Sequence, residues 1–144
     1  MCLVGGDTEV ELKEKQDRVD DAVQAVKAAK KEGILPGGGA ALWHISRNWS
    51  QSLDQSQAIG WKIFMDSIQS PYEKILGNAG LSYKDYDFNK WGLGVDVTDG
   101  KVKDMKKAGI IDPALVTKSA LKNAVSVATT ILSTDAVISN IREV

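Results

Sequence analysis

The chain has 144 residues, enough for one domain with a modest hydrophobic core. Its 26% charged and 43% apolar residues are typical of a soluble globular protein, and its net charge of −1 gives no electrostatic reason to expect nucleic acid or anionic lipid as a partner. The single cysteine, Cys2, excludes an internal disulfide framework, and with the single histidine, His44, it excludes a zinc site built from several Cys and His ligands. No apolar run has the length of a membrane span or the pattern of a signal peptide, so we expect a cytoplasmic, mainly helical protein.

A long helix is predicted over residues 8–32. Thr8 followed by Glu11 forms a capping-box pattern, in which each side chain satisfies a free amide of the first turn. Gly33 then supplies a C-terminal cap. Apolar residues recur at helical spacing and form one stripe, made of Leu12, Val19, Ala22, Val23, Val26 and Ala29.

The sequence LPGGGAAL, residues 35–42, follows that helix and opens a second helical pattern. Glycines at a helix N-terminus leave the first amide groups exposed with no Cβ in the way, which suits a nucleotide or its phosphates. The run has no Lys-Ser/Thr of a Walker A loop and lacks the spacing of a dinucleotide-binding fingerprint. From the residues alone, a flexible turn or tight helix packing is favoured over ligand binding, and both stay open.

Three more helices are predicted in the middle of the chain. The first lies within residues 40–52, Asp54 caps the second, and Pro71 restarts the third at its favoured first position. Gly77 and Gly80 mark the end of the third. Apolar faces are expected in the first helix from Leu42, Ile45 and Trp49, and in the second from Trp61, Phe64, Met65 and Ile68.

A small β-hairpin is predicted within residues 92–105, because the stretch alternates and contains the turn signal Asp99-Gly100. A final helix follows, with Asp112 as N-cap, Pro113 at the first helical position, and an apolar face from Leu121, Val125, Ala128 and Leu132. The tail, residues 134–144, reads as a short strand. It lacks an evident partner in this sequence, so we expect it to pair with another part of the structure or with another subunit.

Four blocks, read in order, resemble the C-terminal part of the group I chaperonin subunit, the GroEL-type family. They are TEVELKEKQDRVDDAV, EGILPGGGAAL, GIIDPALVTKSAL and VATTILSTDAVI, and together they span almost the whole chain. The resemblance implies that residues 1–32 form an intermediate-domain helix and residues 33–144 the C-terminal half of an equatorial ATP-binding domain. The fold expected is mainly α, with a small β-hairpin and a C-terminal edge strand.

The same resemblance assigns roles to two residues of the first helix and its end. Asp21 matches the acid that positions the water attacking the γ-phosphate of ATP, although by itself it reads as one of two solvated acids. Gly33 matches the hinge glycine between the two domains. Gly33 lies twelve residues after Asp21, roughly 18 Å along a helix, so Asp21 meets a nucleotide on the glycines only if the helix swings about its end.

The nucleotide-binding positions come from three other segments. Gly38, with Gly37 beside it, matches a backbone contact to the nucleotide, and Asp112 matches the acid that hydrogen-bonds the ribose. Positions flanking the adenine are Asp96, Val97 and Thr98. The last two replace the small alanines of the family, and residues 92–94 look like a short insertion.

ATP is therefore the expected cofactor, with Mg²⁺ held by residues outside this chain. The expected partners are other chaperonin subunits in a ring, with a co-chaperonin and unfolded proteins bound through parts that the family has and this chain lacks. The family's Gly-Asp-Gly-Thr-Thr phosphate loop is expected upstream of Met1, so the isolated chain is expected not to hydrolyse ATP. The alternative is a non-enzymatic helical assembly module that has lost ATP chemistry, which the larger residues Val97 and Thr98 motivate.

Overall fold

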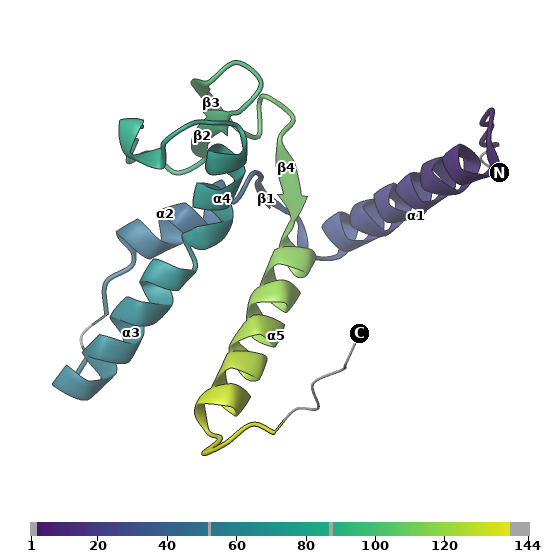
Figure 1. The fold of residues 1–144 in the computed structure, drawn as a ribbon. Coiled ribbons are helices and arrows are strands. Elements are labelled where there is room, and N and C mark those ends of the chain that lie inside the picture. Colours follow the sequence, from purple (N-terminus) through teal and green to yellow (C-terminus); the bar gives the residue numbers. More distant parts are fainter. Residues whose placement is uncertain (1–2, 52, 87, 139–144) are drawn as a thin grey trace.

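The computed structural model describes residues 3–51, 53–86 and 88–138. In Figure 1 the chain is mainly helical, and two short strands, β1 (Ile34–Pro36) and β4 (Ile111–Pro113), form the junction from which the long helices leave. The first helix, α1 (Glu9–Glu32), points away from the rest of the chain, while α5 (Ala114–Leu132) runs in another direction. The predicted mainly helical fold with a small hairpin is confirmed.

Helix α1 begins and ends where the sequence predicted. The Thr8 hydroxyl oxygen accepts from the Glu11 amide at 3.2 Å, and the Glu11 carboxylate accepts from the Asp7 amide at 3.1 Å, one residue before the position that a capping box uses. At the other end, Gly33 has φ 85° and its amide donates to the Ala29 carbonyl at 2.7 Å. No α1 residue between 9 and 32 is fully buried.

The antiparallel pair β1–β4 was not predicted. It places Leu35 opposite Asp112 and joins segments far apart in the chain. The prediction that Asp112 caps the last helix is wrong: Asp112 lies in β4, Pro113 is the N-cap, and no side chain caps α5. Pairing with Leu35 holds Asp112 in an extended conformation, and the first helical amide, of Ala114, donates instead to the Gly33 carbonyl at 3.0 Å.

The three middle helices are α2 (Ala40–Asn48), α3 (Gln55–Ser67) and α4 (Ser70–Asn78). Asp54 caps α3 as predicted, accepting from the Gln57 amide at 2.8 Å. Because α4 begins at Ser70, Pro71 is its second residue and not its first. The face expected on α2 is not its buried one: Trp49 is 60% exposed, whereas Trp43 and His44 are buried.

The predicted hairpin is present as β2 (Leu93–Asp96) and β3 (Lys101–Asp104), with Gly100 at φ 68° in the turn. A short 3₁₀ helix, η1 (Tyr83–Asp85), precedes it. The core lies where α2, α4 and the hairpin meet, and its buried residues are Trp43, Tyr72, Leu76, Phe88 and Val95. This core is small, and its residues come from the middle of the sequence.

The predicted C-terminal strand is wrong over residues 134–138, which form no regular element, and residues 139–144 lie outside the described part. The described strands form two separate two-stranded sheets, β1 with β4 and β2 with β3. Among those residues, no helix is long and apolar enough to cross a membrane.

The chain exposes more surface than a self-contained domain of its mass. Its accessible surface is 11168 Å², whereas a folded monomer of 15.6 kDa exposes about 7,200 Å². The excess comes with long helices that have no fully buried residue, α1 and α5. Much of the apolar surface of these helices therefore has no partner within the described residues.

Candidate functional site

Three of the predicted nucleotide segments meet around Met105, which is 1% exposed. A Cβ added at Gly38 would lie 3.3 Å from the Met105 Cε, and one added at Gly94, two residues before Asp96, would lie 2.7 Å from its Cγ. The Met105 carbonyl accepts from the Ile110 amide at 2.9 Å, which ties the hairpin to the start of β4. Sequence reasoning missed Met105, because a single Met after a run of charged residues carries no pattern.

Close packing accounts for two of the three consecutive glycines. The Gly37 amide donates to the Ile110 carbonyl at 3.0 Å, and a Cβ on Gly37 would lie 2.9 Å from the Ile111 nitrogen. Gly39 has φ 76°, and its Cβ would lie 2.8 Å from the backbone nitrogen of Tyr72 on α4. The tight helix packing left open by the sequence is therefore confirmed at Gly39, whereas Gly37 packs against the backbone at the start of β4.

Gly38 is different, because its only close neighbour is the end of a flexible side chain. Its φ of 64° requires glycine, and it lies at the N-terminus of α2. The Gly38 and Gly39 amides donate to no backbone or side-chain oxygen among the hydrogen bonds of the described residues. Such amides are available to an anion, with the helix dipole in the favourable direction.

Asp112 is half-buried beside this glycine run through the β1–β4 pair. Burial raises the pKa of its carboxyl above the ordinary value. Within the described ranges, no group donates a hydrogen bond to this carboxylate. Asp112 is thus a desolvated acceptor with a place for a donor such as a sugar hydroxyl.

The hairpin turn carries the other predicted positions, Asp96, Val97 and Thr98. The Thr98 amide and hydroxyl donate to one Asp96 oxygen at 3.0 and 2.6 Å, and Lys103 contacts the other at 2.7 Å. The Lys103 bond first, and then the Thr98 bonds, lower the pKa of Asp96 to about 2. The Val97 side chain is 39% exposed.

Asp21 is not brought to these segments. It is exposed on α1, which projects away from the glycine run in Figure 1. A Cβ on Gly33 would meet nothing within 4 Å, so only its φ of 85° calls for glycine at this junction. Beside the junction, the Lys118 ammonium of α5 contacts the Glu32 carboxylate at 2.9 Å.

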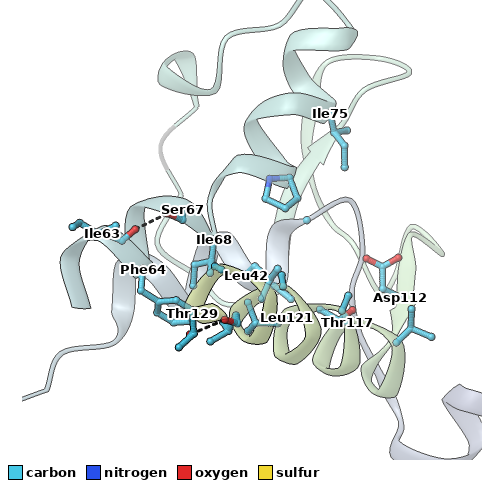
Figure 2. Close-up of a pocket in the computed structure, with 18 of the residues that line it drawn as sticks. Leu42, Ile63, Phe64, Ser67, Ile68, Ile75, Asp112, Thr117, Leu121 and Thr129 are labelled. Carbon is cyan, nitrogen blue, oxygen red and sulfur yellow. Dashed lines mark hydrogen bonds between the residues drawn. The ribbon is translucent and has the colours of Figure 1, made fainter. Parts of the chain in front are cut away.

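A groove of about 890 Å³ lies between α5 on one side and α3 and α4 on the other. Figure 2 shows Phe64, Ile68, Leu42 and Leu121 facing into it, with Asp112 at one end. Asp112 is the charged residue of its lining, which contains no Lys or Arg. Most of this groove is therefore unfilled apolar surface that does not suit a triphosphate, and only the end that carries Asp112 and Gly39 borders the glycine run.

The described residues contain no group of three or more His, Cys, Asp or Glu side chains that could hold a metal ion.

Comparison with known proteins identifies the class. Residues 1–142 match the model of the TCP-1/cpn60 chaperonin family, so the chain belongs to that family. The structure is similar to the crystal structure of a group III chaperonin in the open state, with a TM-score of 0.77 and 28% sequence identity. The match covers 94% of this chain and 30% of that one, so this chain spans less than a third of the chaperonin it resembles. The predicted chaperonin family is confirmed.

Proposed function

We propose that this chain is part of an ATP-dependent chaperonin subunit, which assists the folding of non-native proteins in a ring-shaped oligomer. In this proposal residues 1–32 are the intermediate-domain helix and residues 33–144 the C-terminal half of the equatorial domain. The observation that carries it is the meeting of three separate segments around Met105. These segments are the ones for which the family resemblance implies nucleotide contacts.

The groups available in these segments fit a nucleotide. The unpaired amides at the start of α2, including that of Gly38, suit phosphate oxygens, and Gly37 holds them against β4. In this proposal the half-buried Asp112 carboxylate accepts a hydrogen bond from a ribose hydroxyl. The turn formed by Asp96, Val97 and Thr98 lies beside the base. ATP supplies the phosphoryl group, and Mg²⁺ is held by residues outside this chain.

Asp21 is proposed as the acid that orients the attacking water, so that the γ-phosphoryl group of ATP is transferred to that water in line. Asp21 lies on α1, which projects away from the glycine run (Figure 1), and the proposal puts the point about which α1 swings at Gly33, whose φ is 85°. Closure of the arm would bring the carboxylate to the phosphates. Opening would remove it and stop hydrolysis.

Further parts of the proposal rest on the family alone. The partners are other subunits of a homo-oligomeric ring, and a co-chaperonin and unfolded proteins bind through parts outside this chain, in the cytoplasm. The sequence blocks assign the subunit to group I, whereas the structural match is to a group III chaperonin. The group I assignment therefore stays a prediction that the comparison does not support.

The test replaces Asp21 with Ala in a chaperonin subunit in which this chain occupies the matching segment. Asp21→Ala is expected to lower ATP turnover by a factor on the order of 100 or more while leaving ATP affinity unchanged. Asp20→Ala, the neighbouring acid on α1, is the matched control and should retain turnover. ATPase activity that survives Asp21→Ala would refute the assigned role.

The second candidate is a non-enzymatic assembly module derived from a chaperonin. The hairpin turn favours this candidate, because Val97 is exposed there and the Lys103 ammonium already contacts the Asp96 carboxylate. Calorimetry on the same complete subunit separates the two candidates. Tight, Mg²⁺-dependent ATP binding excludes the assembly module, and absence of binding excludes the ATPase.

A further inference from the structure

The hairpin turn contains Asp99-Gly100, the only Asp-Gly or Asn-Gly pair in the sequence. In such a pair the backbone nitrogen of the glycine can attack the carboxyl carbon of the aspartate, because glycine has no side chain to block the approach. The turn is accessible: the Asp99 side chain is 37% exposed, and a Cβ on Gly100 would meet its nearest neighbour, the Tyr86 hydroxyl, at 3.6 Å. Burial therefore does not prevent chemistry at this pair.

The reaction open to an Asp-Gly pair is isomerisation to isoaspartate. The Gly100 nitrogen bonds to the Asp99 carboxyl carbon, the C–OH bond of the neutral carboxyl breaks, and the hydroxyl leaves with the amide proton as water. The resulting succinimide takes up one water at either carbonyl. When water adds at the main-chain carbonyl of Asp99, the bond from that carbon to the Gly100 nitrogen breaks, and the backbone then runs through the Asp99 side chain with one extra methylene.

Three contacts of the turn oppose this attack. The Gly100 amide donates to the Asp96 carbonyl at 2.8 Å, which holds the nitrogen in the turn. One Asp99 oxygen accepts from the Lys101 amide at 3.2 Å, and the other lies 2.8 Å from the Lys103 ammonium. The carboxylate is therefore bonded to two residues of β3.

The Lys103 contact also acts on the form of the carboxyl that reacts, because only the neutral carboxyl carries a hydroxyl that can leave. The hydrogen bond from Lys103, the largest cause, lowers the pKa of Asp99, and the nearby charge of Asp96 works against this shift. At a pH above that pKa, a lower pKa means a smaller neutral fraction. The ion pair therefore slows the reaction both by holding the carboxylate in place and by keeping it ionised.

We propose that Asp99-Gly100 is a latent isomerisation site, and that Lys103 is the positioning residue that protects it by keeping the Asp99 carboxylate ionised and bonded to β3. This inference does not depend on the proposed function. Without the Lys103 ammonium, Asp99 keeps only the hydrogen bond from the Lys101 amide. Isomerisation then lengthens the turn that sets Asp96 opposite Lys101 in the hairpin.

The experiment follows isoaspartate formation at Asp99 in the full 144-residue chain during incubation in mildly acidic buffer, by proteolysis and electron-transfer mass spectrometry. Lys103→Met should raise the rate by about fivefold, the factor that corresponds to the loss of an exposed ion pair. Lys103→Arg keeps the cation and should retain the parent rate. Lys101→Met is the matched control: it keeps the backbone amide on Asp99, and the Lys101 side chain forms no ion pair among the described residues, so the rate should not change.

A synthetic peptide of residues 94–105 is the reference for an unpaired chain, because it has the same neighbours around Asp99 without the rest of the fold. The parent chain should isomerise several-fold more slowly than this peptide. Within the peptide, Lys103→Met should change the rate little, since a flexible chain seldom holds the ion pair.

Three results overturn the inference. The protecting role is wrong if Lys103→Met isomerises no faster than the parent, and the protection itself is absent if the parent chain reacts as fast as the peptide. Amide hydrogen exchange at Gly100 gives the third test. It should stay slow in Lys103→Met, and a faster isomerisation that comes with lost exchange protection would mean that hairpin opening, and not positioning of Asp99, controls the reaction.

Discussion

Replacing Gly39 with Ala tests whether packing, and not only a ligand, requires the run of glycines. Gly39 lies between β1 and α2 with φ 76°, and a Cβ there would be 2.8 Å from the Tyr72 nitrogen and 2.9 Å from its Cα. Both atoms belong to the backbone of α4, so neither can move away from the added methyl group by a side-chain rotation. Relief of the contact needs α2 and α4 to separate at the small core.

The expected loss of stability follows from two terms. A left-handed conformation costs an L-residue about 1–2 kcal/mol, and forcing an extra methyl into a packed contact costs about 1–3 kcal/mol. Gly39→Ala should therefore lower the free energy of unfolding by about 2–5 kcal/mol, or the melting temperature by on the order of 10 °C. Gly38→Ala should lose less, because its Cβ would meet only the movable Met105 Cε, at 3.3 Å.

The assay is urea denaturation followed by circular dichroism at a low protein concentration, which limits association. Gly77→Ala is the matched control: Gly77 lies in α4, and a Cβ there would meet nothing within 4 Å. That variant should gain about 0.5–1 kcal/mol, because Ala is a better helix former than Gly. A Gly39→Ala variant as stable as the parent, or more stable than Gly38→Ala, would refute the packing argument.

Three further outcomes are expected. Because burial raises the pKa of Asp112, its contribution to stability is present below the ordinary carboxyl pKa of 3.8 and is lost as pH rises through the higher folded value. Asp112→Asn should then melt at least as high as the parent at pH 7, and a lower midpoint would contradict this. Asp96 has the opposite sign: its contribution is present above 3.8 and is lost as pH falls toward about 2, so Asp96→Asn should flatten the acid limb of the melting profile. Lys118→Glu places a second negative charge beside Glu32, so the distribution of spin-label distances between α1 and α5 should broaden, although an exposed pair contributes at most about 1 kcal/mol. An unchanged distribution would show that the Lys118–Glu32 ion pair does not hold α5 against α1.

The excess of exposed surface predicts the behaviour of the chain on its own. Obligate interfaces bury about 2,000–5,000 Å² in total, and the chain exposes 11168 Å², about 4,000 Å² more than a monomer of its mass. Two copies are expected to associate through the apolar groove beside α5, giving a concentration-dependent mass by light scattering. A monodisperse monomer with a sharp cooperative melt would contradict this.

Local chemistry alone determined several elements of this protein. Thr8 and Gly33 cap the two ends of α1, Asp54 caps α3, and Asp99-Gly100 forms the hairpin turn. These features could be predicted because caps and turns depend on residues only a few positions apart. The order of four sequence blocks was enough to predict the chaperonin family, which the family match then confirmed.

Only the tertiary structure decided what depends on segments distant in the chain. Pairing of Leu35 with Asp112 turned a predicted helix cap into a strand residue with a half-buried carboxylate. Three-residue strands that contain proline show no alternation of apolar and polar residues, so no local pattern predicted this strand pair. Packing against α4 and β4 likewise explains Gly39 and Gly37, and Met105 joins segments that no sequence spacing relates. Contacts of this kind depend on which distant segments lie side by side in the folded chain. The sequence therefore indicated that the glycines matter, but only the fold showed that two of them are needed for packing.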